Sequence, residues 1–251
     1  MLYGNDSISS YAPTNISIWM SMAFQAGLLN VGGFMACHRF VSHVTGFATF
    51  FGHELSQGQT HEALGMLAVP IFFLVGVMVS GFLVDLRIKL NKKPQYYVAF
   101  AMVFLLLLFV FIAGTNGFFG KFGDPNLERH SYTLLAILCL VCGIQNGTIT
   151  SVSKAVVRTT HLTGMTTDLG IGLVRFLNRH KIPNYSDEEN YAILMRIGII
   201  VFFALGSVVG AIAFDKFAFS GFLLPLITSG LLLCVRLYIR FFIINKRGLS
   251  T

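Results

Sequence analysis

Charged residues are scarce in this chain. Asp, Glu, Lys and Arg make up 12% of its 251 residues, whereas hydrophobic residues make up 55% and the mean hydropathy is +0.72. An ordinary soluble domain carries about twice this share of charged residues. The 25 glycines agree with this, because Gly is more frequent in membrane helices than in soluble ones. The composition excludes a typical soluble domain and predicts an integral membrane protein.

Motifs of common enzymes and cofactor sites are also missing. The chain has no Gly-x-Ser-x-Gly, His-Glu-x-x-His or P-loop pattern. Its four cysteines lie in apolar runs, which predicts buried thiols rather than a disulfide framework. The histidines at 38, 43, 53 and 61 have no spacing typical of a closed metal site. We therefore predict no cofactor, no metal site and no enzymatic activity.

Long apolar runs dominate what is present. About 20 residues cross the hydrocarbon core of a membrane, and six runs reach this length: 16–37, 64–85, 95–115, 132–153, 191–214 and 218–241. The third has no polar residue between 99 and 113 and is predicted to face lipid. The first and fourth contain amides and glycines. Because amides in hydrocarbon need partners and small residues let helices approach, these two are predicted to line the interior.

Basic residues define the predicted orientation. Thirteen of the 18 Lys and Arg follow the second, fourth and sixth runs: Arg87, Lys89, Lys92, Lys93, Lys154, Arg158, Arg175, Arg179, Lys181, Arg236, Arg240, Lys246 and Arg247. Six spans with both termini in the cytoplasm place all of them on the cytoplasmic side, as the positive-inside rule requires. Membrane topology therefore explains the net charge of +7, and nucleic-acid binding is not expected.

A polar motif occurs twice. Ser42-His43-Val44-Thr45-Gly46 returns as Thr160-His161-Leu162-Thr163-Gly164. Further matched positions at constant spacing are Gly27 and Asn30 with Gly143 and Asn146; Gly52 with Gly170; and Phe73, Gly76 and Asp85 with Phe203, Gly206 and Asp215. The predicted fold is an all-α membrane protein of two three-helix repeats, 1–120 and 121–251, that form one membrane domain. Three spans per repeat is an odd number, so the second repeat is predicted to be inverted, as in many transporters.

The motif segments at 38–60 and 155–178 are too polar for further spans, yet both are amphipathic. We predict that each is a broken or re-entrant helix after the first span of its repeat, with Thr-Gly marking the break. Irregular backbone at membrane depth is tolerated only where it is buried in protein or lines a wet cavity. The alternative is a pair of interfacial amphipathic helices whose polar groups have structural roles only.

Four stretches resemble the YoaK-like membrane family (domain of unknown function 1275): Ala26-Gly27-x-x-Asn30-x-Gly32-Gly33, the motif at 42–46, Gly143-x-Gln145-Asn146, and the run from Arg158 to Gly170. The resemblance covers nearly the whole chain. It implies a prokaryotic-type membrane protein of about six spans, and hence the bacterial cytoplasmic (inner) membrane, but it implies no substrate. Many family members have Asn after the first Thr-Gly, where this chain has Phe47, so an amide has no role at this position here.

The residues predicted to line a solute or ion pathway are Asn30, His43, Thr45, Gly46, Gln145, Asn146, Arg158, His161, Thr163, Gly164 and Asp168. Inversion could bring His43 and His161 together as a proton relay, or both could be structural helix-break residues. Asp168 is the only acid between Glu128 and Asp187, and Phe50 takes its place in the first repeat. Arg158 either pairs with Asp168 or contributes only to topology.

The sequence favours an integral membrane transporter of a small solute or ion, with a midplane site at the repeat interface. Proton coupling through Asp168 is one option. The alternatives are a passive channel, an intramembrane enzyme acting on a lipid-borne substrate, and a scaffold that transports nothing. The expected partners are the solute or ion and membrane lipid, and homo-oligomerisation is left open.

Overall fold

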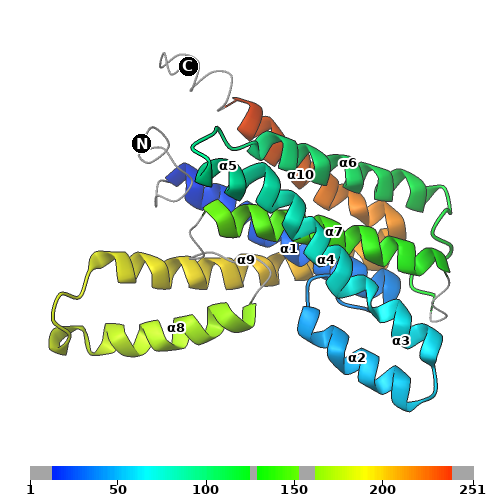
Figure 1. The fold of residues 1–251 in the computed structure, drawn as a ribbon, viewed down its shortest axis with the longest axis horizontal. Helices are drawn as coiled ribbons and strands as arrows, with labels where there is room; N and C mark the ends of the chain where they lie inside the picture. Colours follow the sequence, from blue (N-terminus) through cyan, green and yellow to red (C-terminus); the bar gives the residue numbers. More distant parts are fainter. Residues whose placement is uncertain (1–12, 125–128, 153–161, 239–251) are drawn as a thin grey trace.

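The computed structural model describes residues 13–124, 129–152 and 162–238, and this part of the chain is helical without a strand (Figure 1). Its α-helices are α1 (Pro13–Cys37), α2 (Val44–Ser56), α3 (Thr60–Met66), α4 (Ala68–Ser80), α5 (Leu86–Lys89), α6 (Tyr96–Thr115), α7 (Arg129–Val152), α8 (Leu162–Leu177), α9 (Asp187–Phe217) and α10 (Leu223–Tyr238). A π-helical turn, η1 (Gly81–Asp85), joins α4 to α5, and two 3-10 turns are η2 (Arg179–Lys181) and η3 (Ala218–Phe222).

Five helical stretches of the described residues are long and apolar enough to cross a membrane. They are Asn15–Cys37, Thr60–Lys89, Tyr96–Thr115, Ser131–Ser151 and Asp187–Tyr238. The last contains both α9 and α10, which run in opposite directions in Figure 1. The chain turns between them at Ala218, a non-glycine residue with a positive φ of 48°. The prediction of an all-helical fold with long apolar helices is confirmed, and these stretches are consistent with an integral membrane protein.

The interior of the bundle is formed by α1 and α7. In the apolar windows of these helices 67% and 72% of the residues are buried, compared with 22–39% in the other three stretches. The largest fully buried side chains include Trp19 and Met22 of α1 and Leu134, Leu138 and Ile144 of α7. The prediction that the first and fourth runs line the interior is therefore confirmed.

Helix α6 departs from its prediction. It was expected to face lipid, but one side of it is buried, including Ala99, Val103, Leu107 and Val110. This side packs against α7 and α10. The sequence gives no sign of it because the residues facing lipid and those facing protein are equally apolar, so α6 has no amphipathic period.

Helices from the two sequence copies pack crosswise: α1 lies chiefly against α9, and α4 against α7. At the first contact, a Cβ atom on Gly27 of α1 would overlap the carbonyl oxygen of Phe203 in α9. At the second, a Cβ atom on Gly143 of α7 would overlap the carbonyl oxygen of Phe73 in α4. Gly27 corresponds to Gly143 in the repeat, and Phe203 to Phe73, so equivalent residues make equivalent contacts.

The reverse side of each crossing repeats this relationship. Gly206 of α9 lies against the carbonyl oxygen of Phe24 in α1, and Gly76 of α4 lies against the carbonyl oxygen of Leu140 in α7. Each crossing thus has one glycine on each helix, with backbone touching backbone. Small residues at such positions are the usual means of close packing between membrane helices.

The two motif segments begin amphipathic helices at opposite ends of the bundle. In Figure 1, α2 with α3 lies at one end, whereas α8 and the start of α9 extend from the other. Thr45-Gly46 and Thr163-Gly164 lie in the first turns of α2 and α8. The Thr-Gly pair was predicted to mark a helix break. In both copies it instead lies in the first turn of a helix. In the first copy the break precedes it, between Cys37 and Val44, where His38 has a positive φ of 52°.

The cysteines differ from their prediction at one position. Cys37, Cys139 and Cys142 are buried free thiols, as expected, but Cys234 is exposed. It lies in α10, between Leu231 and Val235, which are also exposed. An apolar run does not distinguish a thiol facing lipid from one facing protein, because both environments are apolar.

Candidate functional site

In the first copy, the motif hydroxyl is bonded to the interior amide. Ser42 Oγ donates a hydrogen bond of 3.0 Å to Asn30 Oδ1 in α1. Ser42 is buried and Asn30 is partly buried. This bond joins two of the positions that the repeat singled out, and it ties the connection before α2 to the last turns of α1. It satisfies polar groups that would be costly to leave unpaired in an apolar interior.

The amides of the second copy have different surroundings. Gln145 Nε2 donates a 2.8 Å hydrogen bond to the carbonyl oxygen of Met22, which joins α7 to α1. Asn146 Oδ1 is buried and has no hydrogen-bond partner among the described residues. By the repeat, its partner would be the hydroxyl of Thr160, which lies outside the described residues. Gln145 links two helices through its Nε2, and both Gln145 Oε1 and Asn146 Oδ1 are buried acceptors without a partner among the described residues.

The position of the His43 side chain is set by neighbouring residues in and next to its own motif. It occupies the N-cap position of α2, its side chain is exposed, and its ring packs edge-on against Phe40 with centroids 5.6 Å apart. A Cβ atom on Gly46 would lie 3.1 Å from His43 Nδ1, so the glycine leaves room for the imidazole. This contact gives a structural reason for the spacing of His and Gly. Thr45 is exposed beside it.

The corresponding residues of the second copy are only partly described. Arg158 and His161 lie outside the described residues, so neither the pairing of His43 with His161 nor that of Arg158 with Asp168 is tested. Thr163 is exposed and Gly164 is half-buried in the first turn of α8. Helix α8 packs against α9, and α2 packs against α3.

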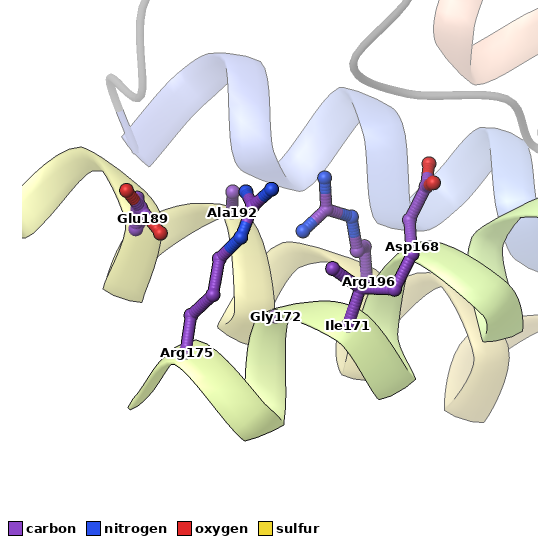
Figure 2. Close-up of a pocket in the computed structure, with 7 residues that line it drawn as sticks. All are labelled: Asp168, Ile171, Gly172, Arg175, Glu189, Ala192 and Arg196. Atoms are coloured by element: carbon purple, nitrogen blue, oxygen red, sulfur yellow. The ribbon is translucent and has the colours of Figure 1, made fainter. Parts of the chain in front are cut away.

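Asp168 opens onto a cavity between α8 and α9 (Figure 2). We call this cavity, of about 190 Å³, the α8–α9 cleft. It is lined by Asp168, Ile171, Gly172, Arg175, Glu189, Ala192 and Arg196. At roughly 30 Å³ per water molecule, this volume equals about six waters, which suits a small solute.

On both helices of the cleft, an acidic residue is followed by an arginine at the same spacing. Arg175 lies seven residues after Asp168 in α8, and Arg196 lies seven residues after Glu189 in α9. Seven residues are close to two helical turns, so both charges of each pair share a helix face. In Figure 2 the charged groups follow one another in the order Glu189, Arg175, Arg196 and Asp168. Two guanidinium groups therefore lie between two carboxylates.

These opposite charges do not close into ion pairs. No arginine of the cleft lies within 4.0 Å of a carboxylate oxygen among the described residues, where Arg39 and Glu54 form the single ion pair. Arg196 is partly buried, and its Nε has no hydrogen-bond partner there. Its Nη1 lies 3.4 Å from the point that a Cβ atom on Gly172 would occupy. The charged groups of the cleft are therefore not paired with one another.

Sequence reasoning identified Asp168 but missed Arg196 and assigned Arg175 to topology alone. A signal for Arg196 was present, because it is a basic residue inside the predicted span 191–214. An ionisable residue within a membrane segment is by default a candidate for function. Nothing in the sequence indicated that α8 would fold back on α9 and bring Arg175 to the same cavity.

The position equivalent to Asp168 in the first repeat has a different environment. Phe50 lies there, and the guanidinium of Arg39 is stacked over its ring at 4.6 Å. Arg39 also donates through Nη2 to Glu54 Oε1 at 2.5 Å and through Nη1 to the carbonyl oxygen of His38 at 3.0 Å. This closed cluster fixes α2 against the preceding loop. Asp168 of the second repeat thus borders a cavity, whereas the ring of its counterpart Phe50 is covered by Arg39.

The described helices are long and apolar enough for an integral membrane protein, and a polar cleft lies between α8 and α9. The profile of a family described as "Protein of unknown function (DUF1275)" matches residues 18–236. The chain belongs to this family, which confirms the resemblance seen in its repeated motif. No curated protein and no solved structure matches the chain.

Proposed function

We propose that this protein is an integral membrane transporter of a small polar solute or ion, built from two inverted copies of a three-helix unit. The observation that carries the proposal is the crosswise packing of α1 on α9 and α4 on α7 through equivalent glycines. Inverted repeats that pack across a common interface are a frequent architecture of secondary transporters. The two units would be residues 1–120 and 121–251.

The ends of the bundle support an inverted arrangement. The connection between α5 and α6 lies at the same end as α8 and the α8–α9 turn, whereas α2 and α3 lie at the opposite end (Figure 1). The first end contains Lys92, Lys93, Arg179 and Lys181. By the positive-inside rule it is the cytoplasmic end, in a bacterial cytoplasmic membrane with both termini inside.

The α8–α9 cleft would be the cytoplasmic vestibule of this transporter. Its arginines supply hydrogen-bond donors and its acids supply acceptors. These arginines and acids form no ion pairs with each other. A small solute with polar groups could bind both kinds of side chain. Asp168 is the acid through which proton coupling would act, since its counterpart Phe50 cannot titrate.

The test is solute-induced current and uptake in proteoliposomes. Panels of amino acids, carboxylates, amines and inorganic salts are applied to wild type, Asp168→Asn and Arg196→Gln. At least one class should produce uptake in the wild type, with a loss of tenfold or more in both variants. Asp215→Asn, which removes an exposed acid of α9 outside the cleft, is the matched control and should transport normally.

The variants also separate coupling from permeation. Asp168→Asn should lose accumulation driven by a pH gradient while retaining exchange of bound solute. Unchanged accumulation would restrict Asp168 to a structural role and favour a passive channel. No flux of any class, together with chemical conversion of added lipid, would replace the transporter with an intramembrane enzyme.

A further inference from the structure

Arg236 is a charged residue buried at the end of the bundle where α10 ends. Only 9% of its surface is exposed. It lines a small cavity with residues of α1, α6 and α7: Ile18, Trp19, Met22, Phe100, Thr148 and Ile149. Its guanidinium lies over the ring of Tyr96, 4.9 Å from the centroid. One face of the guanidinium is therefore covered by an aromatic ring, and its surroundings are largely apolar.

The donor edge of this arginine is unused. Nε and Nη2 are both buried, and neither has a hydrogen-bond partner among the described residues. These two groups form the edge of a guanidinium that binds a carboxylate or phosphate through two parallel hydrogen bonds. An uncompensated buried charge is strongly destabilising, and the single ion pair among the described residues, Arg39–Glu54, does not include Arg236. The protein therefore supplies half of a bidentate ion pair.

The neighbouring cavity is small, and its walls are apolar. Its volume of about 10 Å³ is at the lower limit for one water-sized group. Besides Arg236, its lining includes the indole of Trp19 and the hydroxyl of Thr148. The Thr148 hydroxyl already donates to the carbonyl oxygen of Ile144 at 2.7 Å and contacts Ser80 Oγ at 3.0 Å. No described residue accepts a hydrogen bond from Nε or Nη2 of Arg236, so an acceptor could come from a ligand.

The location favours an anion. Helix α10 ends, and α1 begins, at the end of the bundle where α5 and its following loop lie (Figure 1). That region contains Arg87, Lys89, Lys92 and Lys93. Such a cluster raises the local concentration of anions, and at the cytoplasmic face of a membrane the abundant anions include lipid phosphates.

We infer that the Nε–Nη2 edge of Arg236 binds a phosphate-type oxyanion at the end of the bundle between α1, α6, α7 and α10. The ligand is either the phosphodiester of an anionic lipid headgroup or free inorganic phosphate. This site is separate from the α8–α9 cleft and does not depend on transport.

The experiment measures thermal unfolding of the whole protein in nanodiscs. One arm contains phosphatidylcholine alone, a second adds phosphatidylglycerol, and a third adds inorganic phosphate to phosphatidylcholine. Wild type should unfold roughly 2–4 °C higher in the second or third arm, the shift expected when ligand is present at about four times its dissociation constant. A shift in the second arm alone identifies a lipid ligand, and a shift in the third identifies free phosphate.

Three variants determine whether the shift depends on Arg236. Arg236→Met should unfold no lower than wild type in phosphatidylcholine alone, because it removes an unpaired charge, and it should lose the ligand-dependent shift. Arg236→Lys keeps the charge without the forked edge and should lose at least half of it. Lys89→Gln removes an exposed charge and should keep the full shift. Equal shifts in wild type and Arg236→Lys, or no shift of wild type in either arm, would overturn the inference.

Discussion

Gly206 of α9 lies so close to the backbone carbonyl of Phe24 in α1 that any side chain at this position would overlap it. The counterpart of this contact joins Gly76 of α4 to Leu140 of α7. Each crossing requires a glycine at this position, so matched substitutions in the two helix pairs test whether the crossings are equivalent.

We expect Gly206→Val and Gly76→Val to destabilise the protein by similar amounts, roughly 1–3 kcal/mol each, as overpacking of a well-packed interior does. Thermal unfolding in detergent measures the effect. Gly170→Ala is the control, because no atom lies within 4 Å of a Cβ atom added there. Since alanine favours a helix by about 1 kcal/mol over glycine, this variant should be at least as stable as wild type. Unequal losses in the two valine variants would contradict the equivalence of the crossings.

The interior amides should respond differently to the same substitution. Asn30→Leu leaves the buried hydroxyl of Ser42 without its acceptor and should cost about 1 kcal/mol. Asn146→Leu removes a buried acceptor that has no partner among the described residues, so stability should be unchanged or higher. The double variant Asn30→Leu/Ser42→Ala should recover most of the loss. A loss in Asn146→Leu as large as in Asn30→Leu would show that Asn146 has a bonding role.

The ion pair between Arg39 and Glu54 should be strongly coupled. Its side chains are 14% and 10% exposed, so removing one partner leaves a charge that is mostly buried. We expect Glu54→Gln to destabilise the protein by roughly 3–5 kcal/mol. Arg39→Met/Glu54→Met should be less destabilised than Glu54→Gln, because no charge is left unpaired. A double-mutant cycle measured by unfolding gives the coupling energy, and additive losses would exclude a coupled pair.

Orientation is testable by labelling of single cysteines. In a Cys234→Ser background, which removes the exposed thiol, cysteines at positions 92 and 181 should be labelled from the cytoplasm and one at position 121 from outside. Membrane-impermeant reagents on intact cells and inverted vesicles distinguish the two faces. Labelling of positions 92 and 181 from opposite faces would contradict the inverted repeat.

Sequence reasoning succeeded where one strong local property decides the structure. Apolar runs predicted the stretches that are long and apolar enough to cross a membrane, because the hydrocarbon core requires a minimum length. Polar residues within such runs identified α1 and α7 as the interior, since Asn30 and Gln145 need partners in an apolar medium. The buried face of α6 carried no such signal, because its residues are apolar on every side.

The site was less predictable because it depends on which helices meet. Asp168 stood out as an isolated acid, but its surroundings arise only when α8 folds back on α9 and brings Arg175 and Arg196 to the same cavity. Phe50 and Asp168 occupy equivalent sequence positions, yet Arg39 covers the first and a cavity lies beside the second. Spacing along one chain does not encode such differences between tertiary environments.

The crosswise packing also bears on how the chain is made. Helix α1 is synthesised first, but its main partner, α9, begins only at Asp187, and α4 likewise must await α7. During translation the glycine-lined faces of the first half therefore have no permanent neighbour. The main packing partner of α1 and of α4 lies in the second half of the chain, so the two halves pack against each other much as two subunits of a dimer do. Its assembly is a late event that requires nearly the whole chain to be in the membrane.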